Sequence, residues 1–135
     1  KEAGLENIFS IMDYQQNVFD YLDKFDIMVS SSLWEGVPYA ILEALALGKP
    51  TIAFTSRLSG VSEIFDSGVN GFLVEEDYVN RLAELTVLLH DDRALYEKIS
   101  NNALEQIQKK FSESEMINKT ESLYKSLLYW GQSAK

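Results

Sequence analysis

Residues 30–48 read SSSLWEGVPYAILEALALG, and this stretch joins the end of a strand to a turn and a helix. The apolar run at 25–29, just before it, is typical of a strand. Pro38 suits an early helix position, where its missing N–H group costs nothing. Gly48 fits the left-handed position just past a helix end. We therefore predict a helix over residues 37–47.

The start of this helix is a candidate anion site. Its open N–H groups, at residues such as Tyr39 and Ala40, point back toward the end of the strand. These amides and the helix dipole both favour negative charge, and Gly36 has no side chain to keep a ligand from the backbone. Ligands of open α/β sheets bind at this position, beyond the carboxyl end of a strand.

Two carboxylates flank the candidate site. Glu35 lies in the turn and Glu43 on the otherwise apolar helix, with seven residues between them. A lone ionised group on a buried helix is costly unless something pairs with it. Because carboxylates accept hydrogen bonds from diols, a nucleotide-sugar with its pyrophosphate, ribose and sugar suits the whole arrangement. A structural role stays open for both, with Glu43 bonded to a backbone amide or Lys49 and Glu35 a solvated loop charge.

Simpler roles are favoured for other polar and aromatic residues. We expect the serines at 30–32 to end the strand and Trp34 to pack under the turn. Arg57, in a later loop, is a minor candidate for a phosphate contact. His90 suits the end of a helix, where a cation complements the dipole.

Strand and helix patterns alternate along the first half of the chain. We expect strands at 7–13, 26–31, 51–54 and 71–74, and helices at 18–24 and 60–66. The continuous apolar character of 26–31 predicts burial on both faces. Further helices are expected at 78–90 and 93–110, the second capped by Asp91-Asp92, and a last one to about residue 130 after a capping box at 112–115. The alternation predicts a parallel sheet.

The composition excludes several classes of function. The 135 residues carry a formal net charge of −9, and such a surface repels nucleic acid. The absence of cysteine excludes disulfides and thiol nucleophiles, and no apolar run is long enough to span a membrane. No Asp-x-Asp pair occurs, so we expect no metal-bound donor and no cofactor.

Three blocks of sequence resemble one enzyme family. Residues 34–53, WEGVPYAILEALALGKPTIA, resemble the signature of retaining GT-B glycosyltransferases of the group 1 (family 4) class. Upstream, VFDYLDKFDIMVSSS at 18–32 is similar to the helix and strand that lead into that signature. Downstream, SGVSEIFDSGVNGFLV at 59–74 resembles the family's segment with two glycines followed by a glutamate. The three blocks occur in the family's order and spacing.

The resemblance implies roles for individual residues. Glu35 matches the family's catalytic glutamate, which lies near the transferred sugar and orients it, and Glu43 matches the one that holds the ribose hydroxyls. The positions carried over as donor-binding are Glu43, Gly36, Val37, Pro38, Tyr39, Ala40, Gly60 and Glu63. Two positions depart from the family, because Ser59 replaces a glycine and Pro38 stands where glycine is frequent. The Arg and Lys with which the family neutralises the donor phosphates have no counterpart here.

The resemblance also implies a fold. We expect an α/β, Rossmann-like open parallel sheet flanked by helices, equal to the C-terminal half of a GT-B fold truncated at its N-terminus, with a helical C-terminal tail. Residues 1–135 would form a single partial nucleotide-sugar-binding domain, with an α/β core at 1–77 and the helical tail at 78–135.

The expected function is that of a donor-binding part. The full-length parent would transfer a hexosyl group, with retention, to a glycan or lipid-linked acceptor bound by the missing lobe. It would act in the cytoplasm or at the inner face of the membrane. The fragment itself is expected to be inactive and to dimerise through its last helix. A nucleotide-sugar epimerase of the same fold and a non-catalytic binding module remain the alternatives.

Overall fold

Strands β1 (Met28–Ser30), β2 (Thr51–Phe54) and β3 (Phe72–Val74) pair in parallel and in that order in a computed structural model of the chain. The structure describes residues 4–5, 7–56, 59–75 and 77–133, with the side chains of the last helix described to Leu128. Val29 pairs with Ile52, and Ile52 pairs with Phe72. The predicted parallel sheet is therefore confirmed.

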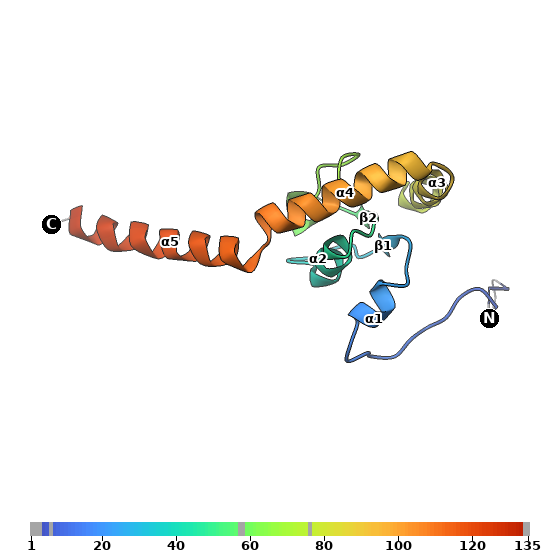
Figure 1. Cartoon of the computed structure of the whole chain (residues 1–135), viewed down its shortest axis with the longest axis horizontal. Coiled ribbons are helices and arrows are strands. Elements are labelled where there is room, and N and C mark those ends of the chain that lie inside the picture. Colours follow the sequence, from blue (N-terminus) through green and yellow to red (C-terminus); the bar gives the residue numbers. More distant parts are fainter. Residues whose placement is uncertain (1–3, 6, 57–58, 76, 134–135) are drawn as a thin grey trace.

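Helices follow each strand and form the C-terminal part of the chain (Figure 1). They are α1 (Phe19–Leu22), α2 (Tyr39–Ala46), the 3₁₀-helix η1 (Gly60–Glu63), α3 (Tyr78–Asp91), α4 (Arg93–Lys110) and α5 (Glu113–Ser133). The predicted α/β fold with a helical C-terminal tail is confirmed. Figure 1 also shows α5 projecting away from the sheet and the other helices.

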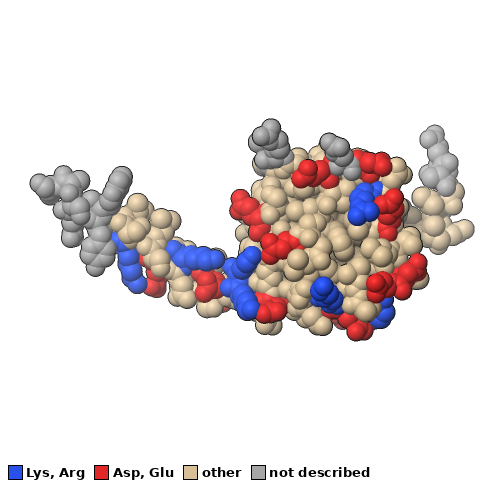
Figure 2. Space-filling view, turned by 90° about the horizontal axis from the view of Figure 1, so that it is seen from above, with Lys and Arg blue, Asp and Glu red and all other residues tan. Residues whose placement is uncertain are grey.

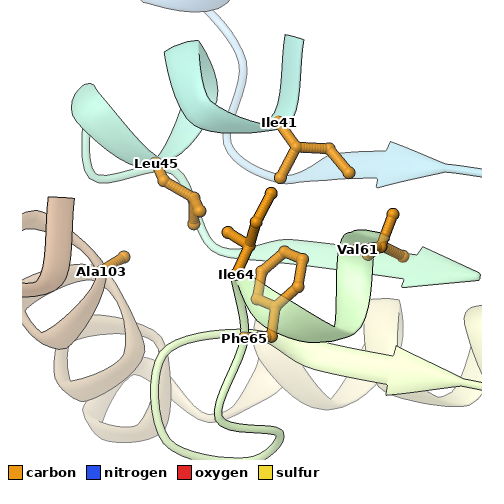
Figure 3. Packing of buried hydrophobic residues seen from close by; sticks show 7 residues of the cluster. Ile41, Leu45, Val61, Ile64, Phe65 and Ala103 are labelled. Atoms are coloured by element: carbon orange, nitrogen blue, oxygen red, sulfur yellow. The ribbon is translucent and has the colours of Figure 1, made fainter. Parts of the chain in front are cut away.

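One face of the sheet packs against α2 and part of α4. Its core cluster comprises Ile41, Leu45, Ala53, Val61, Ile64, Phe65 and Ala103. In Figure 3, Ile41 and Leu45 of α2 face Ile64 and Phe65, and Ala103 of α4 lies beside them. This packing holds α2 against the sheet, with its first residues next to the end of β1.

The other face packs against α3 and the first half of α4. Because neighbouring residues of a strand point to opposite faces, Ile52 turns away from α2. It joins Val74, Leu85, Leu89 and Ile99 in a second buried cluster. Helix α4 therefore contributes to both clusters.

The ends of α2 match most of the predicted signals. Gly48 has a φ of +67°, the left-handed conformation expected just past the helix. Pro38 is the N-cap residue, with φ −79° and ψ 85°, and the helix begins at Tyr39. The predicted start at residue 37 is thus two residues early, because the ψ of Pro38 is not helical.

The predicted strand at residues 7–13 is wrong. These residues form no strand in the structure, and the side chains of Ile8 and Ile11 are 81% and 87% exposed. A strand needs a neighbour to accept its hydrogen bonds, and this segment runs away from the sheet (Figure 1). The predicted burial of 26–31 on both faces is also wrong, because β1 lies at the edge of the sheet and Val29 is exposed.

Two side chains contact the segment before β1, one from α4 and one from the residues between α2 and β2. The Tyr96 hydroxyl on α4 donates to the carbonyl of Asp26 at 3.0 Å, and Lys49 Nζ donates to the carbonyl of Asp23 at 2.7 Å. Burial, followed by the nearby Asp26 carboxylate, raises the pKa of Tyr96 above its usual value, while Arg93 acts in the opposite direction. These contacts hold the residues that precede β1 in place.

The surface of α5 is mixed in character. Its exposed apolar side chains are Met116, Ile117, Leu123, Tyr124, Leu127 and Leu128. In Figure 2, basic and acidic side chains are interspersed along the projecting helix, and the globular part carries side chains of both signs. Dimerisation through α5 stays a prediction. None of the helices, over the residues that the structure describes, has the length and apolar character needed to cross a membrane.

Candidate functional site

An open hollow of about 340 Å³ lies where β1 ends and α2 begins. It is lined by residues 28–32, by Glu35 and by residues 37–41. Its polar lining residues include the three serines at 30–32 and Glu35, and the first residues of α2 also line it. The structure therefore brings together Glu35, Val37, Pro38, Tyr39 and Ala40 of the predicted site.

The first N–H groups of α2 are open toward this hollow. Pro38 makes no side-chain cap, and its carbonyl accepts from the N–H groups of Ile41 at 3.0 Å and Leu42 at 3.2 Å. The N–H groups of Tyr39 and Ala40 precede these bonds and have no acceptor within the helix. Two donors at the positive end of a helix dipole form a site suited to a phosphate.

The two glutamates are placed differently. Glu35 is half-buried and lines the hollow. Glu43 is also half-buried but lies farther along α2, outside the lining of the hollow. Lys49 contacts Asp23 instead of Glu43: its ammonium group lies 3.9 Å from Asp23 Oδ1 and donates to the Asp23 carbonyl at 2.7 Å.

The remaining predicted residues lie beside the hollow. Gly60 packs against the turn at Gly36 and does not line the hollow, and Glu63 is exposed on η1. Gly36 is exposed, and an added Cβ there would meet nothing within 4 Å. Arg57 lies outside the described residues.

The serines at 30–32 and Trp34 lie at the end of β1 and in the turn before α2. The serines at 30–32 were predicted to end the strand, and the structure adds that all three line the hollow. Their place directly after an apolar strand is the signal that identifies them. The prediction that Trp34 packs under the turn is wrong, because its side chain is 66% exposed.

No cluster typical of a metal site occurs in the described part of the chain. There, no group of three or more His, Cys, Asp or Glu side chains is placed to hold a metal ion. The lining of the hollow instead offers backbone amides, serine hydroxyls and the single acidic residue Glu35.

The amino-acid sequence is similar to those of known glycosyltransferases. The chain is 27% identical over 128 residues to N-acetyl-alpha-D-glucosaminyl L-malate synthase of Bacillus anthracis, a match that covers 95% of this chain and 33% of that protein. It is 28% identical over 123 residues to the UDP-Gal:alpha-D-GlcNAc-diphosphoundecaprenol alpha-1,3-galactosyltransferase of Escherichia coli, which covers 91% of this chain and 31% of that protein. The chain thus spans about a third of the length of these curated relatives.

A solved structure shows the same fold. The crystal structure of a glycosyltransferase from Rickettsia africae superposes with a TM-score of 0.82 at 26% identity, over 92% of this chain and 33% of that one. Residues 1–92, more than half of the chain, match the family described as glycosyl transferases group 1. This match includes β1, the turn, α2 and the other two strands. The chain therefore belongs to the group 1 glycosyltransferase family.

Proposed function

We propose that this chain is the nucleotide-sugar donor-binding part of a glycosyltransferase that transfers a hexosyl group, with retention, to a glycan or lipid-linked acceptor. The observation that carries the proposal is the hollow with open amides at Tyr39 and Ala40 and a carboxylate at Glu35. The Escherichia coli relative, whose name gives UDP-Gal as donor, supports the choice of ligand. The whole enzyme acts in the cytoplasm, at the inner face of the membrane when its acceptor is lipid-linked.

In this proposal the donor lies along the turn. The amides of Tyr39 and Ala40 hold the pyrophosphate, and they stabilise the negative charge that develops on it as the nucleoside diphosphate leaves. Glu35 accepts hydrogen bonds from the sugar hydroxyls and orients the sugar, whereas Glu43 accepts from the ribose diol. Because the chain has a net charge of −9, its overall field opposes an anionic donor, so binding depends on these local groups.

The amide of Tyr39 is tested by replacing it with proline. Tyr39→Pro removes one N–H donor, and the first helical position accepts proline. The ψ of Pro38, 85°, lies outside the helical region that a following proline disfavours. We expect Tyr39→Pro to bind UDP about tenfold more weakly than Tyr39→Ala, since a hydrogen bond to a charged group contributes about 1.5–3 kcal/mol. Titrations followed by amide NMR give both affinities, which we expect to be on the order of millimolar.

Tyr39→Ala is the matched control for this experiment, because it removes the same side chain and keeps the N–H group. Equal UDP affinities for the two variants would contradict a phosphate site at the start of α2. A Tyr39→Pro protein with an unchanged melting temperature confirms that the helix itself is intact.

Glu43 is tested through the ribose. Glu43→Gln is expected to weaken UDP binding about tenfold, because charge-assisted hydrogen bonds to the ribose diol become neutral ones. Binding of 2′,3′-dideoxy-UDP, which lacks the diol, is expected to stay the same. The exposed Glu113→Gln on α5 provides the control for loss of one negative charge. An equal loss for both nucleotides would show that Glu43 does not contact the ribose.

A further inference from the structure

The backbone of Gly60 is already committed to the turn that carries Glu35. Its N–H group donates to the carbonyl oxygen of Glu35 at 2.9 Å. The loop after β2 and the turn after β1 are thus joined by a backbone hydrogen bond at the carboxyl edge of the sheet. An N–H group that makes this bond is not open to a phosphate.

The contact between the two loops requires a glycine at position 60 but not at position 36. A Cβ added to Gly60 would lie 2.1 Å from the carbonyl oxygen of Gly36 and 3.3 Å from its carbonyl carbon. A Cβ on Gly36 would meet nothing within 4 Å. Gly60 therefore provides the space in which the Glu35-Gly36 backbone rests.

Gly60 is itself held by the core. The buried Ser59 precedes it, and Ser59 Oγ accepts from the N–H group of Val61 at 3.4 Å. Val61 is fully buried in the cluster beneath α2. A second bond from the same loop, from Ser56 Oγ to the carbonyl of Leu33 at 3.4 Å, reaches the other end of the turn. The loop after β2 thus holds the turn on both sides of Trp34.

We propose that Gly60, assisted by Ser56, is a positioning residue that fixes the Glu35 carboxylate at the hollow and does not bind the donor phosphates itself. The resemblance implies donor binding by Gly60, but its N–H group is already bonded to Glu35, which leaves Gly60 an indirect role. It rests on the proposed function for the role of Glu35, whereas the backbone contact is independent of any ligand.

The experiment compares the unaltered chain with Gly60→Ala. The methyl group displaces the Glu35-Gly36 backbone, so we expect the indole N–H resonance of Trp34 and the amide resonances of 33–36 to shift. A Trp130→Phe background leaves Trp34 as the sole tryptophan. We expect the unaltered chain to bind UDP-galactose a few-fold more tightly than UDP, and Gly60→Ala to lose this preference while its UDP affinity stays within twofold.

Direct phosphate binding by Gly60 gives a different result. UDP affinity would then fall as much as UDP-galactose affinity, and that outcome overturns the proposal, as does an unshifted Trp34 resonance. Gly36→Ala serves as the control for stability and for the Trp34 resonance, both of which we expect to be nearly unchanged. Ser56→Ala adds no bulk and decides the question should Gly60→Ala not fold, with a smaller shift at 33–35 expected and its absence contradicting the proposal.

A failure of the proposed function is separable from a failure of this inference. An unaltered chain that binds neither UDP nor UDP-galactose contradicts the donor site. The resonances of Trp34 and its neighbours still report whether Gly60 and Ser56 fix the turn.

Discussion

Leu45→Ala is expected to lower the free energy of unfolding by about 3 kcal/mol, within the range seen for buried leucines. The Leu45 side chain is fully buried between the sheet and α4, in the cluster that also holds Ile41 and Ala103 (Figure 3). Removing its methyl groups loses their burial and leaves a cavity that the surrounding helices fill only in part. Urea denaturation followed by circular dichroism measures the change.

Leu128→Ala is the matched control, because it makes the same chemical change at a side chain of α5 that is 71% exposed. We expect it to change the free energy of unfolding by less than about 0.5 kcal/mol. A loss below about 1 kcal/mol for Leu45→Ala would mean that α2 does not rest on this core. The core would then not hold the amides of Tyr39 and Ala40 in position, and the candidate site would lack a fixed geometry.

The elements that the sequence predicted well are those whose signals are local. Helix α4 has the predicted bounds, and its start is fixed by Asp92, whose Oδ1 accepts from the N–H group of Leu95 at 2.9 Å. The start of α5 follows the same rule, since Ser112 Oγ accepts from the N–H group of Glu115 at 3.3 Å. A capping side chain and the helix N–H group that donates to it lie within four residues of each other. The local sequence is therefore enough to predict where such a helix begins.

The failures concern features that depend on distant residues. The segment at 7–13 has a strand-like composition, but composition does not supply a neighbouring strand to pair with. The exposure of Val29 likewise follows from the position of β1 at the edge of the sheet, which no local pattern determines.

In the candidate site too, some features follow from the local sequence and others depend on distant residues. Glu35 and residues 37–40 were predictable because one turn places them around the same hollow. The bond from Gly60 to Glu35 joins two loops that are separated by α2 and β2, so only the structure shows that it exists. The family resemblance marked Gly60 as important, and the contact with Gly36 supplies a physical reason that a motif does not contain.

Gly71→Ala is expected to lower the free energy of unfolding by about 3 kcal/mol, at the upper end of the usual cost of overpacking. Gly71 is buried just before β3, where a Cβ would lie 2.3 Å from both Cδ1 and Cε1 of Phe65 and 3.0 Å from the carbonyl oxygen of Thr51. Its φ lies outside the left-handed region, so the expected loss is steric and does not arise from backbone strain. Thermal or urea unfolding measures it.

The Phe65 ring is what makes this loss large, and a double-mutant cycle isolates its share. In a Phe65→Leu background the ring edge is absent, so we expect the added cost of Gly71→Ala to fall to about 1 kcal/mol, with the difference appearing as coupling between neighbours. Gly36→Ala makes the same chemical change in open space and is expected to cost less than about 0.5 kcal/mol. Equal costs of Gly71→Ala in both backgrounds would place the conflict at the Thr51 carbonyl. The 3.0 Å contact with the backbone of β2, which has no side-chain freedom to relax, would then be the one that excludes a side chain at this position.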